Sequence, residues 1–156
     1  MKNIILAVVM MIASIGANAQ LFHIKEGMQG DLSQYTKYGN SYYGEKIRFA
    51  GLLFETTLGI KDGKVSYVGY IHNTATLSNI EYKATLDTIL VELSKTYGIA
   101  QWVGYVNDNG DEYKGSQKRA LKLFSKGILK KLIEWKDVSL MILKGESANF
   151  FCVYEN

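Results

Sequence analysis

The dipeptide Asp62-Gly63 constrains the fold of this chain more than any other feature, because it joins two β-rich runs. The runs are residues 46–60 and 64–73, and Asp-Gly between such runs favours a two-residue turn that pairs them as an antiparallel hairpin. This turn predicts the pairs Lys61–Lys64, Ile60–Val65, Leu58–Tyr67 and Phe54–Ile71, with an apolar face formed by the last three. The opposite face is predicted to be mixed, with the pairs Glu55–Tyr70, Thr57–Val68 and Leu53–His72.

A helix follows the hairpin, and both of its ends are marked in the sequence. Ser78 and Glu81 have the spacing of a capping box, in which the hydroxyl and the carboxylate satisfy amides at the start of a helix. Apolar and aromatic residues then recur at helical spacing along one stripe: Tyr82, Leu86, Ile89, Leu90, Leu93 and Tyr97. Gly98 supplies the left-handed residue that ends a helix, so we predict a helix over residues 79–97.

The remaining chain reads as a strand at residues 99–106, a polar loop, a second helical pattern and a closing hairpin. Ser116 caps the helical pattern, which is interrupted at Gly127, where glycine costs about 1 kcal/mol relative to alanine. Residues 128–135 are therefore left open between helix and strand. The hairpin is predicted around Gly145-Glu146, a dipeptide that suits a type II′ turn. Its expected pairs are Met141–Phe150, Leu140–Phe151 and Ser139–Cys152.

The order ββ-α-β-α-ββ predicts an α+β domain with an antiparallel sheet of about five to six strands and helices on one face. We place this single domain at residues 47–156. Residues 20–46 are rich in Gly and Tyr and lack periodicity, so they are expected to be irregular apart from a short strand near residues 22–25.

The first 19 residues have the three parts of a secretory signal peptide. Lys2 is the positive end, residues 4–15 form an apolar run, and Ala17-Asn18-Ala19 is a small-x-small cleavage site. The run is too short for a transmembrane helix, which needs about 20 apolar residues. We predict an exported protein, periplasmic or secreted, with cleavage after Ala19 and no transmembrane segment.

The order of these signals resembles a group of small exported bacterial proteins of unknown function. They share a glycine-bearing β-hairpin, a helix ending in Tyr-Gly and a C-terminal hairpin. The residues that carry the resemblance are Phe49, Gly51, Phe54, Lys64, Val65, Val68, Tyr82, Leu86, Leu90, Leu93, Tyr97, Gly98, Trp135, Val138, Leu140, Ile142, Val153, Tyr154 and Asn156. The resemblance covers about residues 47–156, implies the fold and export, and implies no mechanism.

The sequence offers little for catalysis or metal binding. Cys152 is the only cysteine and lies in an apolar strand pattern, where a thiol packs as a small hydrophobe. His23 and His72 are the only histidines, too few for a zinc site, and the loop 107–112 lacks the full calcium-binding register. Glu55 lies within a strand but has no evident carboxylate partner. We therefore expect no cofactor, no metal and binding rather than catalysis, with a small envelope hydrolase as the alternative.

Basic residues gather in one region. Residues 114–136 hold eight of the eighteen lysines and arginines, whereas the mature charge of about +2 is too small to indicate nucleic acid. On a continuous helix, four lysines would step along one side: Lys118, Lys122, Lys126 and Lys130. Such a side is either an ordinary solvated face or a surface for anionic membranes or glycans.

Tyrosines form the other candidate surface. Tyr42 and Tyr43 belong to the stretch 35–46, which holds four of the eleven tyrosines. We expect them to join Tyr70, His72 and Trp102 on the mixed face of the sheet, because tyrosine gives large contact area with few rotatable bonds. The stretch is predicted to act first as a flap over that face and second as a recognition surface. The predicted function is an exported domain that binds an unidentified protein or glycan partner.

Overall fold

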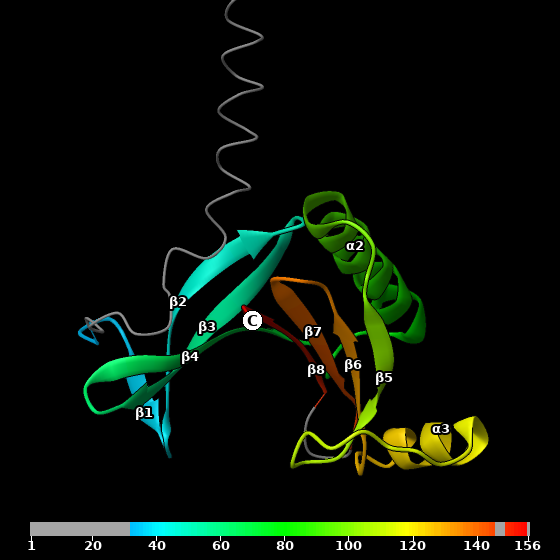
Figure 1. The fold of residues 1–156 in the computed structure, drawn as a ribbon. Helices are drawn as coiled ribbons and strands as arrows, with labels where there is room; N and C mark the ends of the chain where they lie inside the picture. The colour runs from blue at the N-terminus through cyan, green and yellow to red at the C-terminus, as the bar shows by residue number, and fades with distance from the viewer. Residues whose placement is uncertain (1–31, 146–148, 156) are drawn as a thin grey trace, which may run out of the picture.

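The computed structural model describes residues 32–145 and 149–155, and the side chain of Glu155 is outside the description. The order of elements is an N-terminal run of four strands, a long helix, a strand, a short helix and three closing strands (Figure 1). Their bounds are β1 Thr36–Tyr38, β2 Ser41–Phe49, β3 Leu52–Lys61, β4 Lys64–Asn73, α2 Asn79–Tyr97, β5 Trp102–Val106, α3 Gln117–Ser125, β6 Lys130–Glu134, β7 Val138–Leu143 and β8 Phe150–Glu155.

All strands belong to one antiparallel sheet in the order β1-β2-β3-β4-β8-β7-β6-β5. The predicted α+β class is confirmed, but the sheet has eight strands rather than five to six. Because β4 pairs with β8, the last strand of the N-terminal run and the C-terminal strand meet at the centre of the sheet, and α2 carries the chain from there to the outer strand β5.

The stretch predicted to be a flap is instead the outer hairpin of the sheet. Tyr38 pairs with Ser41 across the β1–β2 turn, and β2 continues to Phe49. The run 46–60 is not one strand, because Ala50 and Gly51 both have positive φ and make a two-residue turn between β2 and β3. An alanine in this conformation is uncommon, so Ala50-Gly51 was not recognisable as a turn. The expected strand at residues 22–25 lies outside the described residues.

The first predicted hairpin is confirmed at its turn and wrong further along. Lys61 pairs with Lys64 and Ile60 with Val65 as expected. A bulge between Gly59 and Ile60 then shifts the register by one residue, so Leu58 pairs with Val68 rather than Tyr67, and Glu55 rather than Phe54 pairs with Ile71. A one-residue shift moves every later side chain relative to its expected partner.

In the second half of the chain, the structure decides between helix and strand for residues 128–135. Helix α3 ends at Ser125, Gly127 takes a φ of 74°, and residues 130–134 form β6. The closing hairpin has a longer loop than predicted, since the first pair is Leu143–Phe150. Its register therefore differs by two residues, and Cys152 pairs with Met141 rather than Ser139. Glu146 lies outside the described residues.

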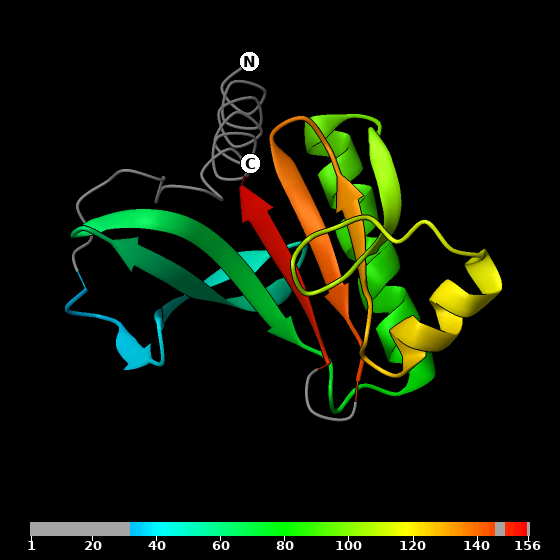
Figure 2. The same cartoon turned by 60° about the horizontal axis from the view of Figure 1, so that its bottom comes forward.

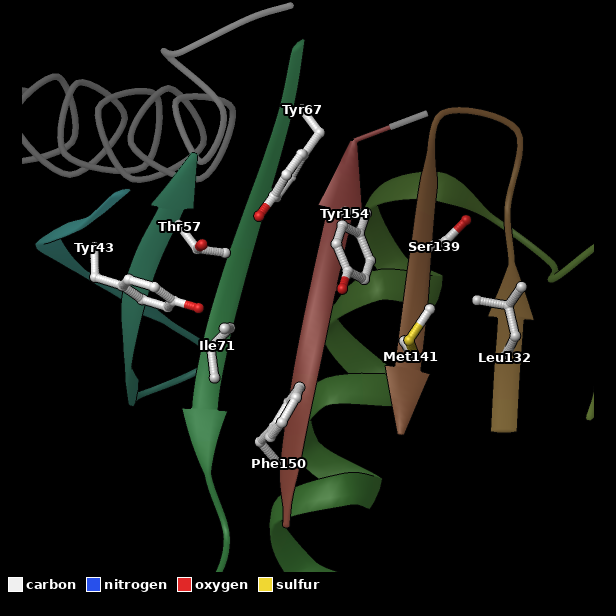
Figure 3. Close-up of a pocket in the computed structure, with 9 residues that line it drawn as sticks. All are labelled: Tyr43, Thr57, Tyr67, Ile71, Leu132, Ser139, Met141, Phe150 and Tyr154. Carbon is white, nitrogen blue, oxygen red and sulfur yellow. The ribbon is translucent and has the colours of Figure 1, made fainter. Parts of the chain in front are cut away.

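Helix α2 covers one face of the sheet, behind β7 and β8 (Figures 2 and 3). The predicted bounds and capping box of this helix are confirmed: Ser78 Oγ accepts from the Glu81 amide and the Glu81 carboxylate accepts from the Ser78 amide. Ile89 and Leu93 are fully buried, and the Tyr82 ring lies 4.9 Å from that of Phe151. Neither described helix is both long and apolar enough to cross a membrane.

Candidate functional site

The two faces of the sheet differ in what covers them. Side chains of alternating residues point to opposite faces of a strand, so the register assigns each residue to one face. The helix-covered face holds the most deeply buried side chains, among them Phe54, Leu58, Tyr70, Ile142 and Phe151. The open face carries no described helix, and Figure 3 views it directly with α2 behind the strands.

A pocket of about 520 Å³ occupies the centre of the open face. Its walls come from six strands, β2, β3, β4, β6, β7 and β8 (Figure 3). The lining residues are Tyr43, Thr57, Tyr67, Ile71, Leu132, Ser139, Met141, Phe150 and Tyr154. Tyr43 on β2 and Leu132 on β6 are separated by four strands, about 24 Å in a flat sheet. One pocket includes both residues because the sheet curves toward this face.

Tyr67 forms one side of the pocket and is held by a glycine and a serine. Its ring lies against Gly59, its partner across the β3–β4 ladder. A β-carbon at Gly59 would lie 2.2 Å from Tyr67 Cδ1, so only glycine allows this ring position. The Tyr67 hydroxyl is 2.7 Å from Ser41 Oγ, which ties the ring to the start of β2. An aromatic ring over a cross-strand glycine covers backbone that would otherwise be bare.

The floor of the pocket is buried. Gly69 lets Tyr154 and Cys152 approach closely, since a β-carbon there would lie 3.1 Å from Tyr154 Cε1 and 3.2 Å from Cys152 Sγ. Cys152 is fully buried, and burial raises the pKa of its thiol to about 12. Burial also raises the pKa of the Tyr154 phenol, with smaller contributions from Cys152, Tyr67 and Tyr43. The predicted packing role of Cys152 agrees with this environment, because a nucleophilic thiol needs a lowered pKa.

Three phenol groups thus share one end of the pocket. Figure 3 shows the hydroxyls of Tyr43 and Tyr67 turned toward the middle of the pocket from opposite sides, with Tyr154 beyond them on β8. Thr57 lies beneath them at 3% exposure, and its Oγ1 has no hydrogen-bond partner among the described residues. The other end is apolar, with Ile71, Leu132, Met141 and Phe150. None of the lining residues is charged.

The five residues proposed from the sequence as one aromatic surface do not converge. Tyr43 lines the pocket, whereas Tyr42, its neighbour in β2, packs against the core of the other face. Tyr70 is 1% exposed within that core. The expected single surface of Tyr42, Tyr43, Tyr70, His72 and Trp102 is therefore wrong, because adjacent strand residues point to opposite faces.

His72 and Trp102 lie away from the pocket. His72 packs on the helix-covered face, with its ring 5.4 Å from that of Phe54 and its Nδ1 2.9 Å from the Leu53 carbonyl oxygen. Trp102 is on the outer strand β5, where its ring lies over Gly104. Glu55 is exposed on β3, and neither Glu55 nor His72 lines the open-face pocket.

The basic residues do not form the continuous line that one long helix would give. Lys118 and Lys122 lie on α3, Lys126 follows its last residue, and Lys130 begins β6. Lys130 Nζ is 3.1 Å from Asp108 Oδ1 and is thereby paired. The prediction of four lysines on one side fails because the helix ends before Gly127.

The polar loop 107–112 uses its side chains internally. Asn107 Oδ1 accepts from the amides of Asn109 and Asp111, and Asn107 Nδ2 donates to Asp111 Oδ2 over 3.0 Å. These hydrogen bonds are typical of an Asx turn. The part of the chain that the structure describes holds no group of three or more His, Cys, Asp or Glu side chains that would bind a metal.

The pocket residues that were not predicted from the sequence lie mostly in β8 and in the part of β4 whose register is shifted. Phe150 and Tyr154 alternate with buried residues in β8, and that alternation was visible in the sequence. Tyr67 was assigned to the opposite, apolar face because the bulge beside Gly59 was not foreseen. Glycines opposite tyrosines are the signal that would have located it.

The fold and site define the class only broadly: an α+β protein with a curved antiparallel sheet and an uncharged pocket on its open face. Comparison of the chain with protein-family models, curated proteins and solved structures finds no match.

Proposed function

We propose that the protein is an exported, non-catalytic binding domain whose ligand site is the open-face pocket. The observation that carries this proposal is the pocket itself, about 520 Å³ in volume with four aromatic walls. Small-molecule sites have volumes of about 300–1,000 Å³ and combine apolar and aromatic linings with few polar groups. Export rests on the signal-like first 19 residues.

Binding is favoured over catalysis by the chemistry of the lining. General acid–base catalysis needs a side chain that titrates near the working pH, within hydrogen-bond reach of the substrate. The lining residues carry hydroxyls, a thioether and hydrocarbon groups only. The floor thiol of Cys152 is held in its protonated form by burial. A hydrolase centred on Glu55 or His72 has less support, since both residues lie outside the pocket.

The proposal is tested with the mature protein and N-phenyl-1-naphthylamine, a neutral fluorescent probe with two ring systems. We expect a saturable rise in its emission, and we expect Tyr43→Ala to weaken binding by about tenfold through loss of one aromatic wall. Tyr38→Ala is the matched control, because Tyr38 belongs to the same hairpin, is 80% exposed and does not line the pocket. Absence of saturable binding, or equal effects of the two variants, would reject the proposal.

The alternative function is contact with an anionic membrane or glycan through the basic surface of helix α3 and its flanks. A separate observation supports it. Helix α3 and its flanks expose cations without ion-pair partners among the described residues: Lys114, Lys118, Arg119, Lys122 and Lys126. Leu121 and Ile128 are 50% and 54% exposed in the same region. Residues 113–133 include no Asp or Glu. Basic side chains beside exposed aliphatic ones are typical of helices that lie on anionic lipid.

Co-sedimentation with phosphatidylglycerol-containing vesicles tests this alternative. We expect Lys118→Glu, Lys122→Glu and Lys126→Glu together to abolish vesicle binding if α3 is the contact. A control variant with the same charge change, Lys61→Glu, Lys64→Glu and Lys83→Glu, alters exposed lysines elsewhere and should still bind. Equal loss in both variants would assign the binding to net charge, and no binding by the unaltered protein would exclude the function.

A further inference from the structure

The polarity of the open-face pocket is graded, and this grading restricts the ligand. The phenol end holds the hydroxyls of Tyr43, Tyr67 and Tyr154, and the other end is built from hydrocarbon and thioether groups with the single, buried hydroxyl of Ser139 near Leu132. The inference drawn from this arrangement rests on the proposed binding function. We propose that the pocket selects an uncharged amphiphile, with an apolar body along Phe150, Met141 and Leu132 and a hydroxyl or carbonyl group at the phenol end.

The uncharged lining of the pocket disfavours charged ligands. An ion that exchanges part of its hydration shell for an uncharged surface loses hydration free energy unless an opposite charge compensates it. The lining offers no such charge, because it includes no Lys, Arg, Asp, Glu or His. Burial raises the pKa values of both Tyr154 and Cys152, so this environment already disfavours negative charge on the protein's own groups.

The phenol end of the pocket favours a ligand group that forms hydrogen bonds. The hydroxyl of Tyr43 has no partner among the described residues and is turned toward the middle of the pocket (Figure 3). Beneath it, the buried Oγ1 of Thr57 also lacks a described partner. A buried hydroxyl without a partner is unfavourable, and a ligand hydroxyl or carbonyl that reaches Thr57 between Tyr43 and Tyr67 would supply the missing hydrogen bond. Phenols both donate and accept, so either ligand group is suitable.

The distribution of polar groups in the lining disfavours sugars. Sugar sites depend on many directed hydrogen bonds, whereas four of the nine lining residues here carry no hydrogen-bonding hydroxyl or amide group. Apart from Ser139, which lies on β7 near Leu132 and is 5% exposed, the polar groups gather at one end, which matches a ligand with one polar head rather than a ring of hydroxyls. A lipid-like or terpenoid-like alcohol, ester or ketone has this distribution. The volume of about 520 Å³ admits one such molecule.

Displacement of N-phenyl-1-naphthylamine by three ligands with the same chain tests the inference: decanol, decanoate and decylammonium. At neutral pH we expect decanol to displace the probe with an affinity at least about tenfold higher than either ion. Acidification that protonates decanoate should bring its affinity to that of decanol, because the lining includes no Asp, Glu or His. Equal displacement by the ions at neutral pH would overturn the inference while the binding function stands.

A separate variant, Tyr43→Phe, tests the preference of the pocket for a ligand hydroxyl. Tyr43→Phe keeps the aromatic wall and removes only the phenol oxygen, so it should weaken decanol by about threefold to tenfold and leave decane unchanged. Tyr38→Phe, on the exposed end of the same hairpin, should change neither. Failure of every ligand and of the probe to bind would instead reject the proposed function. If light scattering shows a dimer that Phe150→Ala dissociates, the open face is an interface between copies and the inference is wrong.

Discussion

The two faces of the sheet share the same strands but differ in how their side chains are stabilised. On the helix-covered face, Phe54, Leu140 and Phe151 are fully buried against α2 and one another. On the open face, Phe150 and Tyr154 are only partly buried, while Cys152 between them is fully buried. The difference indicates that stability resides mainly on one face, and that the other keeps aromatic groups available for a ligand.

The adjacent residues Phe150 and Phe151 give the most direct test, because they point to opposite faces of β8. Phe151→Ala should lower the free energy of unfolding by about 3–5 kcal/mol, the usual cost of emptying a buried aromatic site. Phe150→Ala should lower it by about 1–2 kcal/mol and weaken probe binding strongly, since Phe150 lines the pocket. Urea unfolding and probe titration measure the two effects, and equal destabilisation would remove the distinction between the faces.

Alkaline pH tests how dry the floor of the open face is. The Cys152 thiol has an ordinary pKa of 9.0, which the fold raises to about 12. Between these values the folded state holds a proton that the unfolded chain has released, so the free energy of unfolding falls by about 1.4 kcal/mol per pH unit. Stability from this group is complete below pH 9 and is lost as the pH rises.

The measurement is the urea midpoint from neutral pH to about pH 11, compared between the unaltered protein and Cys152→Ala. The variant loses the thiol and should show the shallower alkaline decline, whatever its stability at neutral pH. Tyr154→Phe should also flatten the decline, because burial raises the pKa of that phenol above its ordinary 10.0. Identical slopes in all three proteins would mean that water reaches the pocket floor.

Glycine positions sharpen the comparison between the pocket and the rest of the open face. Gly59→Ala places a β-carbon where the Tyr67 ring now lies, so the ring must leave and its bond to Ser41 must break. We expect probe affinity to fall by about tenfold. Gly104→Ala is the matched control, since its β-carbon would displace Trp102 in the same way, 2.3 Å from Cζ2, but outside the pocket. An equal loss of affinity in both would show that the effect is not local.

The same glycines show how far the sequence could predict the structure. Helix α2 was predictable to its ends, because its capping box, apolar stripe and terminal Gly98 all act locally. The Asp62-Gly63 turn was predictable for the same reason. The pocket was not, because it depends on the bulge beside Gly59 and on the Ala50-Gly51 turn. Both features are fixed by tertiary contacts of the sheet, and neither residue pair has a strong turn signal.

The candidate site was predictable only in part. Tyr43 was chosen from composition, but composition does not distinguish it from Tyr42, which points the other way. Assigning a residue to a face requires the register, and an error of one residue inverts the assignment. The two-residue error in the closing hairpin was harmless in this respect, since it preserved the faces of Phe150 and Cys152.

The helix cap tests how much the covered face depends on α2. Ser78→Ala removes the acceptor of the Glu81 amide and should lower the free energy of unfolding by about 1 kcal/mol. The Ser78 hydrogen bonds lower the pKa of Glu81, so their contribution is present above its ordinary pKa of 4.5 and is lost as the pH falls through the lowered value. Urea midpoints in mild acid should therefore fall less steeply in the variant, while probe affinity stays unchanged.

The smallest expected effect comes from Thr56 and Thr57, neighbours in β3 that are 0% and 3% exposed on opposite faces. Neither Oγ1 has a hydrogen-bond partner among the described residues. Replacing each by the isosteric valine removes an unpaired buried hydroxyl and should raise the free energy of unfolding by up to about 1 kcal/mol. The two variants should then diverge: Thr56→Val should leave the decanol affinity unchanged, whereas Thr57→Val should weaken it, because only Thr57 lies under the phenol end of the pocket. Equal decanol affinities would show that the ligand's polar group does not reach the floor, and would place it between Tyr43 and Tyr67 alone.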